Sequence, residues 1–314
     1  MIRVGLLGTG FGETHAEIYN RLDNFELKSI FGRNAGKLAE LAETTGAETT
    51  SEIESILNDP EIDLVDIALP TEVHAHWAVE ALRRGKHVFI ETPVAYALSD
   101  AETIQKASQE AGKHVFVDLF IKFSAAHRIA AELVRKGEFG GLRSVRAYNH
   151  TSPQWGDLSL KKNVETFHNH LVDFAIGLVG MPTGVTASGV ELGEGQSVVT
   201  TLLSYPNQLV SLESNSGMPE CAPFLIGFEL IFANGVARYD ALFGDYEREE
   251  FSVATDAGRK LLELPETDDY EEVIKHVGQC IEAGRRSDDI DISNAVAGVM
   301  VKQQILEALG IADS

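Results

Sequence analysis

The stretch IRVGLLGTGFGETHAEIYNRL, residues 2–22, decides the fold. Its first six residues form an apolar run that stops at Gly8, and apolar residues then recur with helical spacing from residue 15 onward. This order predicts a strand, a tight turn and a helix. Gly8 permits the turn, and Gly10 lets the backbone approach a pyrophosphate at the helix N-terminus. The third glycine of the usual dinucleotide-binding spacing would stand at Glu13, so the pattern is met at two of its three glycines.

Strand-like and helix-like segments alternate from residue 25 to about residue 120. Ser99 is predicted to cap the last of the helices, and glycines are predicted to end three of them. The predicted strands are 25–32, 63–69, 87–91 and 114–119, and the predicted helices are 35–46, 51–59, 74–85 and 99–112. Such alternation is typical of a parallel sheet with helices on both faces. We therefore expect an α/β Rossmann domain, a doubly wound parallel sheet, over residues 1–120.

Candidate strands follow one another directly in the second half of the chain. They are 142–151, 184–192, 197–205, 208–216, 227–234, 236–242, 246–253 and 260–265. Two helical stretches, 266–284 and 293–309, come last. This order predicts an α+β domain with an open-faced, mostly antiparallel sheet over residues 121–314. Because one face of that sheet needs covering, we expect a homo-oligomer.

The composition of the 314 residues excludes several classes of protein. A formal net charge of −22 disfavours binding to nucleic acid or to anionic membrane surfaces. No apolar segment is long enough for a membrane helix. Cys221 and Cys280 lie far apart, which fits a reducing cytoplasm, and the His, Cys and Asp spacing predicts no metal site. We expect a cytoplasmic protein that acts on a small molecule.

The end of the second predicted strand bears on the choice of cofactor. An NAD enzyme usually places Asp or Glu there to bind the ribose 2′-hydroxyl. This chain has Gly32 followed by Arg33. A missing carboxylate beside an arginine suits a 2′-phosphate, so we predict a preference for NADP(H), with NAD(H) as the alternative.

Two further motifs, PTEVH at 70–74 and GKHVFIETP at 85–93, make a family resemblance specific. With the glycine turn, they resemble the Gfo/Idh/MocA family of sugar and polyol oxidoreductases, whose members include glucose–fructose oxidoreductase and inositol dehydrogenase. The resemblance implies that Leu69, Pro70, Thr71, His74 and Glu91 lie near the bound nicotinamide nucleotide, and that the bond before Pro93 is cis. Together with the glycine turn and Arg33, the predicted cofactor-binding residues are Gly8, Thr9, Gly10, Phe11, Gly12, Arg33, Leu69, Pro70, Thr71, His74, Glu91, Thr92 and Pro93.

The chain departs from the family at the residues that the resemblance marks as catalytic. The family motif is Glu-Lys-Pro, and here Thr92 replaces its lysine. In TFHNHLVD, residues 166–173, His170 takes the family's histidine position, while Thr166 replaces the catalytic aspartate and His168 the usual glycine. His170 is our candidate acid/base, since an unperturbed imidazole titrates near neutrality. One of the two histidines is alternatively a structural residue, because positions two apart on a helix face different ways.

Other polar groups are predicted on the substrate side. Lys122, where family members often carry arginine, is expected to supply positive charge, with Thr92 and Thr166 as hydrogen-bonding groups. Trp155 and His168 are candidate substrate contacts, although a packed loop tryptophan fits Trp155 equally well.

The predicted function is hydride transfer between a nicotinamide cofactor and a hydroxyl or carbonyl of a sugar, polyol or related small molecule. The alternatives are a non-catalytic, dinucleotide-responsive binding protein and a redox-neutral reaction with a tightly held cofactor. The several titratable groups favour the active oxidoreductase.

Overall fold

The computed structural model describes residues 1–244 and 247–312. The chain forms two compact units, the first comprising Met1–Phe123 and Asp268–Val299, and the second Ser124–Thr267 and Met300–Ser314. Residues 268–299 thus belong to the first unit, although the sequence analysis placed them in the second domain. Tyr246, the first residue of one predicted strand, lies outside the described residues.

The first unit contains a six-stranded, all-parallel sheet, in the order β3-β2-β1-β4-β5-β6. Its strands are β1 Ile2–Leu7, β2 Phe25–Phe31, β3 Glu48–Thr50, β4 Leu64–Ile67, β5 His87–Ile90 and β6 Val115–Val117. This is the doubly wound order with its switch point beside β1, where such sheets bind ligands. The predicted Rossmann fold is confirmed.

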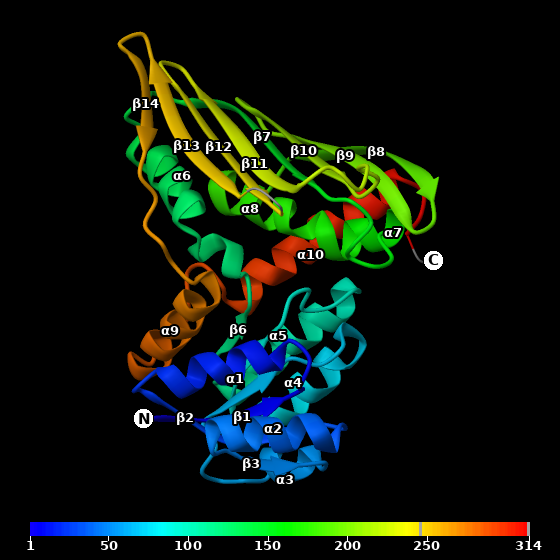
Figure 1. Cartoon of the computed structure of the whole chain (residues 1–314), viewed down its shortest axis with the longest axis vertical. Coiled ribbons are helices and arrows are strands. Elements are labelled where there is room, and N and C mark those ends of the chain that lie inside the picture. The colour runs from blue at the N-terminus through cyan, green and yellow to red at the C-terminus, as the bar shows by residue number, and fades with distance from the viewer. Residues whose placement is uncertain (245–246, 313–314) are drawn as a thin grey trace. The chain divides into compact units, whose positions relative to one another are not determined.

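Helices flank both faces of this sheet (Figure 1), with α1 packed against α2 and α9, and α4 against α5. They are α1 Gly12–Arg21, α2 Ala35–Thr45, α3 Ile53–Leu57, α4 His74–Arg83, α5 Leu98–Ala111 and α9 Asp269–Glu282, with 3₁₀ turns η1 Thr71–Val73 and η2 Phe120–Phe123. Gly46 and Gly112 end α2 and α5 in the left-handed conformation, as predicted. The predicted cap at Ser99 is wrong, because α5 already begins at Leu98 and Ala97 is its N-cap.

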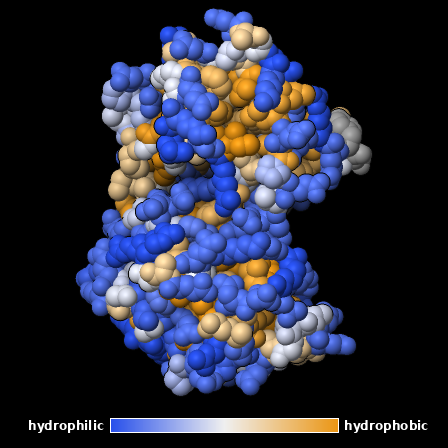
Figure 2. Space-filling view, turned by 90° about the vertical axis from the view of Figure 1, so that its left-hand side faces the viewer, coloured by the Kyte–Doolittle hydropathy of each residue, from blue (hydrophilic) through white to orange (hydrophobic). Residues whose placement is uncertain are grey.

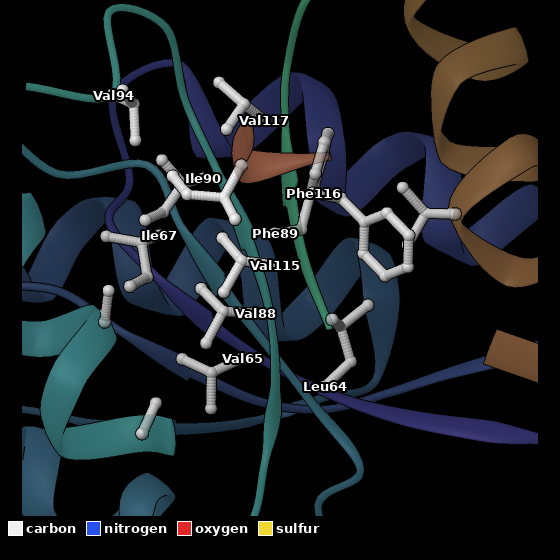
Figure 3. Close-up of a cluster of buried hydrophobic side chains, with 14 of the residues drawn as sticks. Leu64, Val65, Ile67, Val88, Phe89, Ile90, Val94, Val115, Phe116 and Val117 are labelled. Atoms are coloured by element: carbon white, nitrogen blue, oxygen red, sulfur yellow. The ribbon is translucent and has the colours of Figure 1, made fainter. Parts of the chain in front are cut away.

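The core of the first unit is built from the β-branched and aromatic residues of its central strands. Val65 and Ile67 of β4, Val88 of β5 and Val115 of β6 are fully buried. Figure 3 shows these side chains gathered around the three strands. A parallel strand buried on both faces has a continuous apolar sequence, as these do. The apolar strands β5 and β6 therefore end directly at carboxylates, Glu91 and Asp118.

The second unit contains an eight-stranded sheet, in the order β14-β13-β12-β11-β7-β10-β9-β8. Its strands are β7 Leu142–His150, β8 Gly184–Gly193, β9 Gln196–Ser204, β10 Leu209–Asn215, β11 Phe224–Phe232, β12 Val236–Phe243, β13 Arg248–Thr255 and β14 Gly258–Leu262. All neighbouring pairs are antiparallel except β7 and β10, which are parallel. The predicted mostly antiparallel sheet is confirmed.

One face of the second sheet is covered by helices, since α8 packs against α6, β7 and β10 (Figure 1). The helical elements are α6 Ala125–Lys136, α7 Leu160–Lys162, a π-helical turn at Asn163–Phe167, α8 Asn169–Val179 and α10 Ile292–Ala308. Val301 and Ile305 of α10 are fully buried in this unit's core. The covered face therefore has a conventional apolar interior.

Apolar side chains remain exposed on the opposite face of this sheet. Along β9 and β10 the buried residues alternate with outward ones, among them Leu202 and Leu209, which are 39% and 48% exposed. Val190 of β8 and Ile231 of β11 are exposed as well. Figure 2 shows hydrophobic side chains gathered on the surface of this unit. Within the described residues, no helix combines the length and the apolar character that crossing a membrane requires.

Candidate functional site

The glycine turn between β1 and α1 has the geometry of a phosphate cradle. Gly8 has φ of 123°, and a Cβ there would lie 2.2 Å from the Ala68 carbonyl oxygen. A Cβ at Gly10, by contrast, would meet no described atom within 4 Å. The Glu13 and Thr14 N–H groups donate to the Gly10 and Phe11 carbonyls, and no side chain of the described residues caps α1 at Phe11. An anion at this terminus would therefore meet the N–H groups of the turn that precedes Glu13. The residues present therefore fit a dinucleotide pyrophosphate.

Two cationic side chains lie beyond the end of β2. A Cβ at Gly32 would lie 2.6 Å from Thr9 Cγ2, so a side chain at this position would have to displace the Thr9 methyl group. Arg33 follows and is exposed. Lys37, in the first turn of α2, places its Nζ 3.3 Å from the Thr9 carbonyl oxygen and 3.7 Å from Glu13. The sequence analysis missed Lys37. Its position about one helical turn after Arg33 could have indicated a second cation near the predicted 2′-phosphate site.

His74 supports the turn that follows β4. Its Nε2 lies 2.7 Å from the Leu69 carbonyl oxygen, and the ring is buried. Burial lowers the pKa of His74, so the ring is neutral at pH 7. Pro70 and Thr71 lie in the same turn, where η1 begins. The ring therefore holds the Leu69–Thr71 backbone in place.

The loop after β5 carries Glu91, Thr92 and Pro93, and the Thr92–Pro93 bond is cis as predicted. The Thr92 N–H donates to Glu91 Oε2 at 2.9 Å, which fixes that carboxylate beside the backbone. Among the described residues, the buried Thr92 hydroxyl has no hydrogen-bond partner. A buried hydroxyl left this way is costly, so this one is suited to bind a ligand.

A buried polar cluster lies behind this loop, and the sequence analysis missed it. His15 Nδ1 lies 2.9 Å from Asp66 Oδ2, to which the Tyr19 hydroxyl also donates at 2.9 Å. His15 Nε2 lies 3.2 Å from Glu91 Oε1 and 3.3 Å from Asp118 Oδ2. These groups come from α1, β4 and the ends of β5 and β6, so no local sequence motif indicates that they lie together.

The environment of this cluster raises the pKa values of both Asp118 and His15. Burial first, and then the charge of Glu91, raises the pKa of Asp118 to about 7. Burial alone would lower the pKa of His15, but the neighbouring carboxylates, Asp66 foremost, raise it well above its usual value. The cluster therefore holds more negative charge than one imidazolium neutralises.

In the second unit, the two histidines around the start of α8 differ in environment. His168 is fully buried, with Nδ1 2.7 Å from Ser214 Oγ and Nε2 3.0 Å from Thr201 Oγ1. Burial lowers the pKa of His168 to about 3. Both ring nitrogens are engaged, so a structural role fits His168 better than the predicted substrate contact. His170 is half-buried, and burial lowers its pKa to about 4.

The other predicted catalytic groups are partly engaged by backbone. The Thr166 hydroxyl donates to the Lys162 carbonyl at 2.7 Å, one helical turn back. The Lys122 ammonium, in η2 of the first unit, donates to the Asp289 carbonyl at 2.8 Å. Trp155 is 58% exposed, with its ring 5.2 Å from that of Phe224. Of these side chains, the tryptophan is the most accessible to a ligand.

A buried ionic group in the second unit was also missed. Lys302 of α10 is fully buried, and burial lowers its pKa to about 8 while Glu165 and Asp173 act against that shift. Asn169 Nδ2 donates to Asp173 Oδ2 at 3.1 Å. Lys302 lies more than 120 residues after its acidic neighbours, which is why the sequence analysis did not connect them.

Comparison with known proteins identifies a family match in the N-terminal part of the chain. Residues 2–119 match the family described as "Oxidoreductase family, NAD-binding Rossmann fold". The 4-carboxy-2-hydroxymuconate-6-semialdehyde dehydrogenase of Sphingobium sp. is 34% identical over 139 residues, which are 44% of this chain and 44% of that protein. The scyllo-inositol 2-dehydrogenase (NADP(+)) of Bacillus subtilis is 26% identical over 210 residues, 63% of this chain and 57% of that protein. The matched part is thus about half the length of these relatives.

The fold likeness extends over almost the whole chain. The crystal structure of aldose–aldose oxidoreductase from Caulobacter crescentus superposes with a TM-score of 0.85 at 20% identity, covering 98% of this chain and 97% of that one. At this identity the likeness concerns the fold alone. It covers both units.

Proposed function

We propose that this chain, whose residues 2–119 match the Gfo/Idh/MocA oxidoreductase family, transfers a hydride between NADP(H) and a hydroxyl or carbonyl of a sugar, polyol or related small molecule. The observation that carries the proposal is the glycine turn, in which Gly8 is sterically required and Gly10 leaves space before an uncapped helix. The bound nicotinamide supplies the hydride chemistry. The protein supplies binding, orientation and proton transfer.

The cofactor-binding residues have separate roles in this proposal. The backbone of residues 8–12 binds the pyrophosphate, and Arg33 with Lys37 binds the 2′-phosphate. The absence of a carboxylate at position 32 supports NADP(H) over NAD(H), as does the NADP(+)-dependent relative. The Leu69–Thr71 turn and the Glu91–Pro93 loop orient the nicotinamide end. The unpartnered Thr92 hydroxyl is the side-chain group proposed to bind the nucleotide or the substrate there.

Proton transfer is assigned to His170 of the second unit. Its neutral ring accepts the proton of the substrate hydroxyl when the substrate is oxidised, and returns it to the carbonyl oxygen when the reaction runs backward. Thr166 and Trp155 are proposed to contact the substrate, and Lys122 to add positive charge. The inositol dehydrogenase among the similar proteins supports this substrate class.

The test combines binding with turnover. Fluorescence titrations with NADPH and NADH should show tighter binding of NADPH, and a screen of sugars and polyols with NADP⁺ should yield reduced cofactor. Failure to bind either nucleotide would remove the proposal. Binding without turnover across the screen would favour a dinucleotide-responsive binding protein instead.

The oligomeric state and the cellular location are part of the same proposal. We propose a homo-oligomer that covers the exposed apolar residues of the second sheet, such as Leu202 and Leu209. Light scattering should give a mass that is a multiple of 34.2 kDa. We also propose a cytoplasmic location, which the two free cysteines support; cell fractionation tests it.

A further inference from the structure

Three metal-ligand side chains converge in the first unit at the ends of buried elements. His15 extends from α1, while Glu91 and Asp118 directly follow Ile90 and Val117, the last residues of β5 and β6. One ligand atom from each side chain lies within 4.8 Å of the other two. His15 and Asp118 are fully buried. Parallel strands bring their carboxyl ends to one edge, so the convergence follows from the topology.

The distances in this cluster suit a shared ion better than hydrogen bonds. Charge-assisted N–H···O bonds are about 2.7–2.9 Å long. His15 Nε2 lies 3.2 Å from Glu91 Oε1 and 3.3 Å from Asp118 Oδ2. Donor atoms that bind one zinc ion at about 2.1 Å in tetrahedral geometry lie about 3.4 Å apart. The two distances from Nε2 are therefore close to the distance expected between two ligand atoms of one metal ion.

The same donor atoms lack other partners. In the part of the chain that the structure describes, His15 Nε2, Glu91 Oε1 and both Asp118 carboxylate oxygens make no hydrogen bond. Glu91 uses its other oxygen, Oε2, for the Thr92 N–H. A fully buried carboxylate whose two oxygens accept no hydrogen bond, as at Asp118, carries a large desolvation cost. A cation among these atoms would offset that cost.

The imidazole is held in the orientation that a metal ligand needs. Asp66 lies 2.9 Å from Nδ1, which presents Nε2 to the two carboxylates. The Phe89 ring stacks on the imidazole with 5.4 Å between centroids, and the Phe11 ring meets it edge-on at 5.6 Å. A carboxylate behind a ligating histidine fixes its tautomer and raises its basicity. The second shell of a metal site is thus already in place.

We propose that His15, Glu91 and Asp118 bind one first-row divalent cation, with Asp66 as the outer partner of His15. One imidazole nitrogen and two carboxylate oxygens form a mixed donor set, which suits Zn²⁺ or Mn²⁺ better than the all-oxygen ions Ca²⁺ and Mg²⁺. The charge of the cluster also favours a bound cation, because the three carboxylates of Asp66, Glu91 and Asp118 face a single imidazole. The remaining coordination positions are taken by water. The sequence analysis predicted no metal site because these ligands are separated by 76 and 27 residues.

The experiment measures metal binding directly and does not depend on turnover. The full-length protein is stripped with a chelator, exchanged into metal-free buffer and titrated by calorimetry with Zn²⁺, Mn²⁺ and Mg²⁺ in turn. We expect one equivalent of Zn²⁺ or Mn²⁺ per chain and weaker Mg²⁺ binding. Asp66→Asn should weaken binding about 10- to 100-fold, as loss of a second-shell partner does, and Asp118→Asn should weaken it further.

The matched control is Glu102→Gln, which removes one exposed carboxylate of α5 and should leave metal binding unchanged. Glu91→Gln is the second ligand variant, in case the buried Asp118→Asn chain does not fold. A wild-type protein that takes up neither Zn²⁺ nor Mn²⁺ would overturn the proposal. Protons bound to the carboxylates would then offset the negative charge of the cluster. Wild-type affinity in both folded ligand variants would overturn it as well.

Discussion

At the residue scale, the glycine at position 32 bears on cofactor choice. The missing Cβ lets the Thr9 methyl group approach the end of β2, and the chain has no carboxylate there to bind a ribose 2′-hydroxyl. The nearby charges are those of Arg33 and Lys37. Whatever binds there meets guanidinium and ammonium groups, which prefer a phosphate.

Replacing Arg33 with alanine should weaken NADPH binding about tenfold or more and leave NADH binding nearly unchanged, because only NADPH carries the 2′-phosphate. Lys37→Ala should act in the same direction. Fluorescence titration of both nucleotides measures the effect, with Arg135→Ala, on the exposed surface of the second unit, as the control. Equal losses for both nucleotides would contradict the assignment.

Two glycines offer a matched pair that separates binding from stability. Gly10→Ala should fold normally and lose nucleotide affinity, because its Cβ enters the space proposed for the pyrophosphate. Gly46→Ala should bind normally and lose about 1 kcal/mol of unfolding free energy, because φ at that residue is 72°. Thermal unfolding and nucleotide titration of both variants are the measurements. The reverse pattern would show that the turn is only structural.

His170→Gln should lower kcat about 10²- to 10⁴-fold with little change in nucleotide affinity, if His170 is the acid/base. His76→Gln, on the exposed side of α4, is the control and should retain the wild-type rate. A His170→Gln enzyme with normal turnover would exclude this role and direct attention to other titratable groups of the second unit, such as Lys302.

At the level of elements, local patterns were predictable and long-range pairings were not. The glycines that end α2 and α5 act within one turn, so Gly46 and Gly112 could be identified from the sequence. The β7–β10 parallel pair joins segments about 65 residues apart, and α9 pairs with α1 across 250 residues. The Asp66, Asp118 and His15 cluster depends on strand order in the same way. Only the folded sheet brings such residues together.

The helix-covered face of the second sheet should make this unit sensitive to acid. Burial lowers the pKa of His127 of α6 and of His168 to about 3, and that of His170 to about 4. In the unfolded chain these rings titrate near 6.5. Unfolding therefore takes up protons below about pH 6.5, and the unfolding free energy should fall as the pH drops from 6.5 toward 3.

Melting temperatures measured from pH 8 to pH 4 test this expectation. They should be level above pH 7 and decline below 6.5. His168→Gln, which retains groups that can hydrogen-bond Ser214 and Thr201, should have a shallower decline, while the exposed-site control His76→Gln should follow the wild-type curve. A wild-type melting temperature that is constant down to pH 4 would show that these rings accept protons in the folded chain.

At the scale of the whole molecule, the first unit is discontinuous in sequence, since it needs residues 268–299 as well as 1–123. Val273, Ile274 and Val277 of α9 are fully buried in its core. A chain ending at residue 267 retains every predicted cofactor-binding residue but lacks this helix. We expect it to bind no NADPH and to bind a hydrophobic dye. NADPH affinity equal to that of the full chain would show that residues 1–123 fold without α9.

The discontinuity also sets the order of events during synthesis. When residue 123 leaves the ribosome, the parallel sheet is complete, but the helix that covers part of it is still about 145 residues away. At about 5–20 residues per second, the nascent chain waits roughly 7 to 30 seconds for α9. During that interval the apolar groove that α9 later fills is open to chaperones and to other nascent chains. The yield of folded protein in a cell should therefore depend on translation speed and chaperone supply.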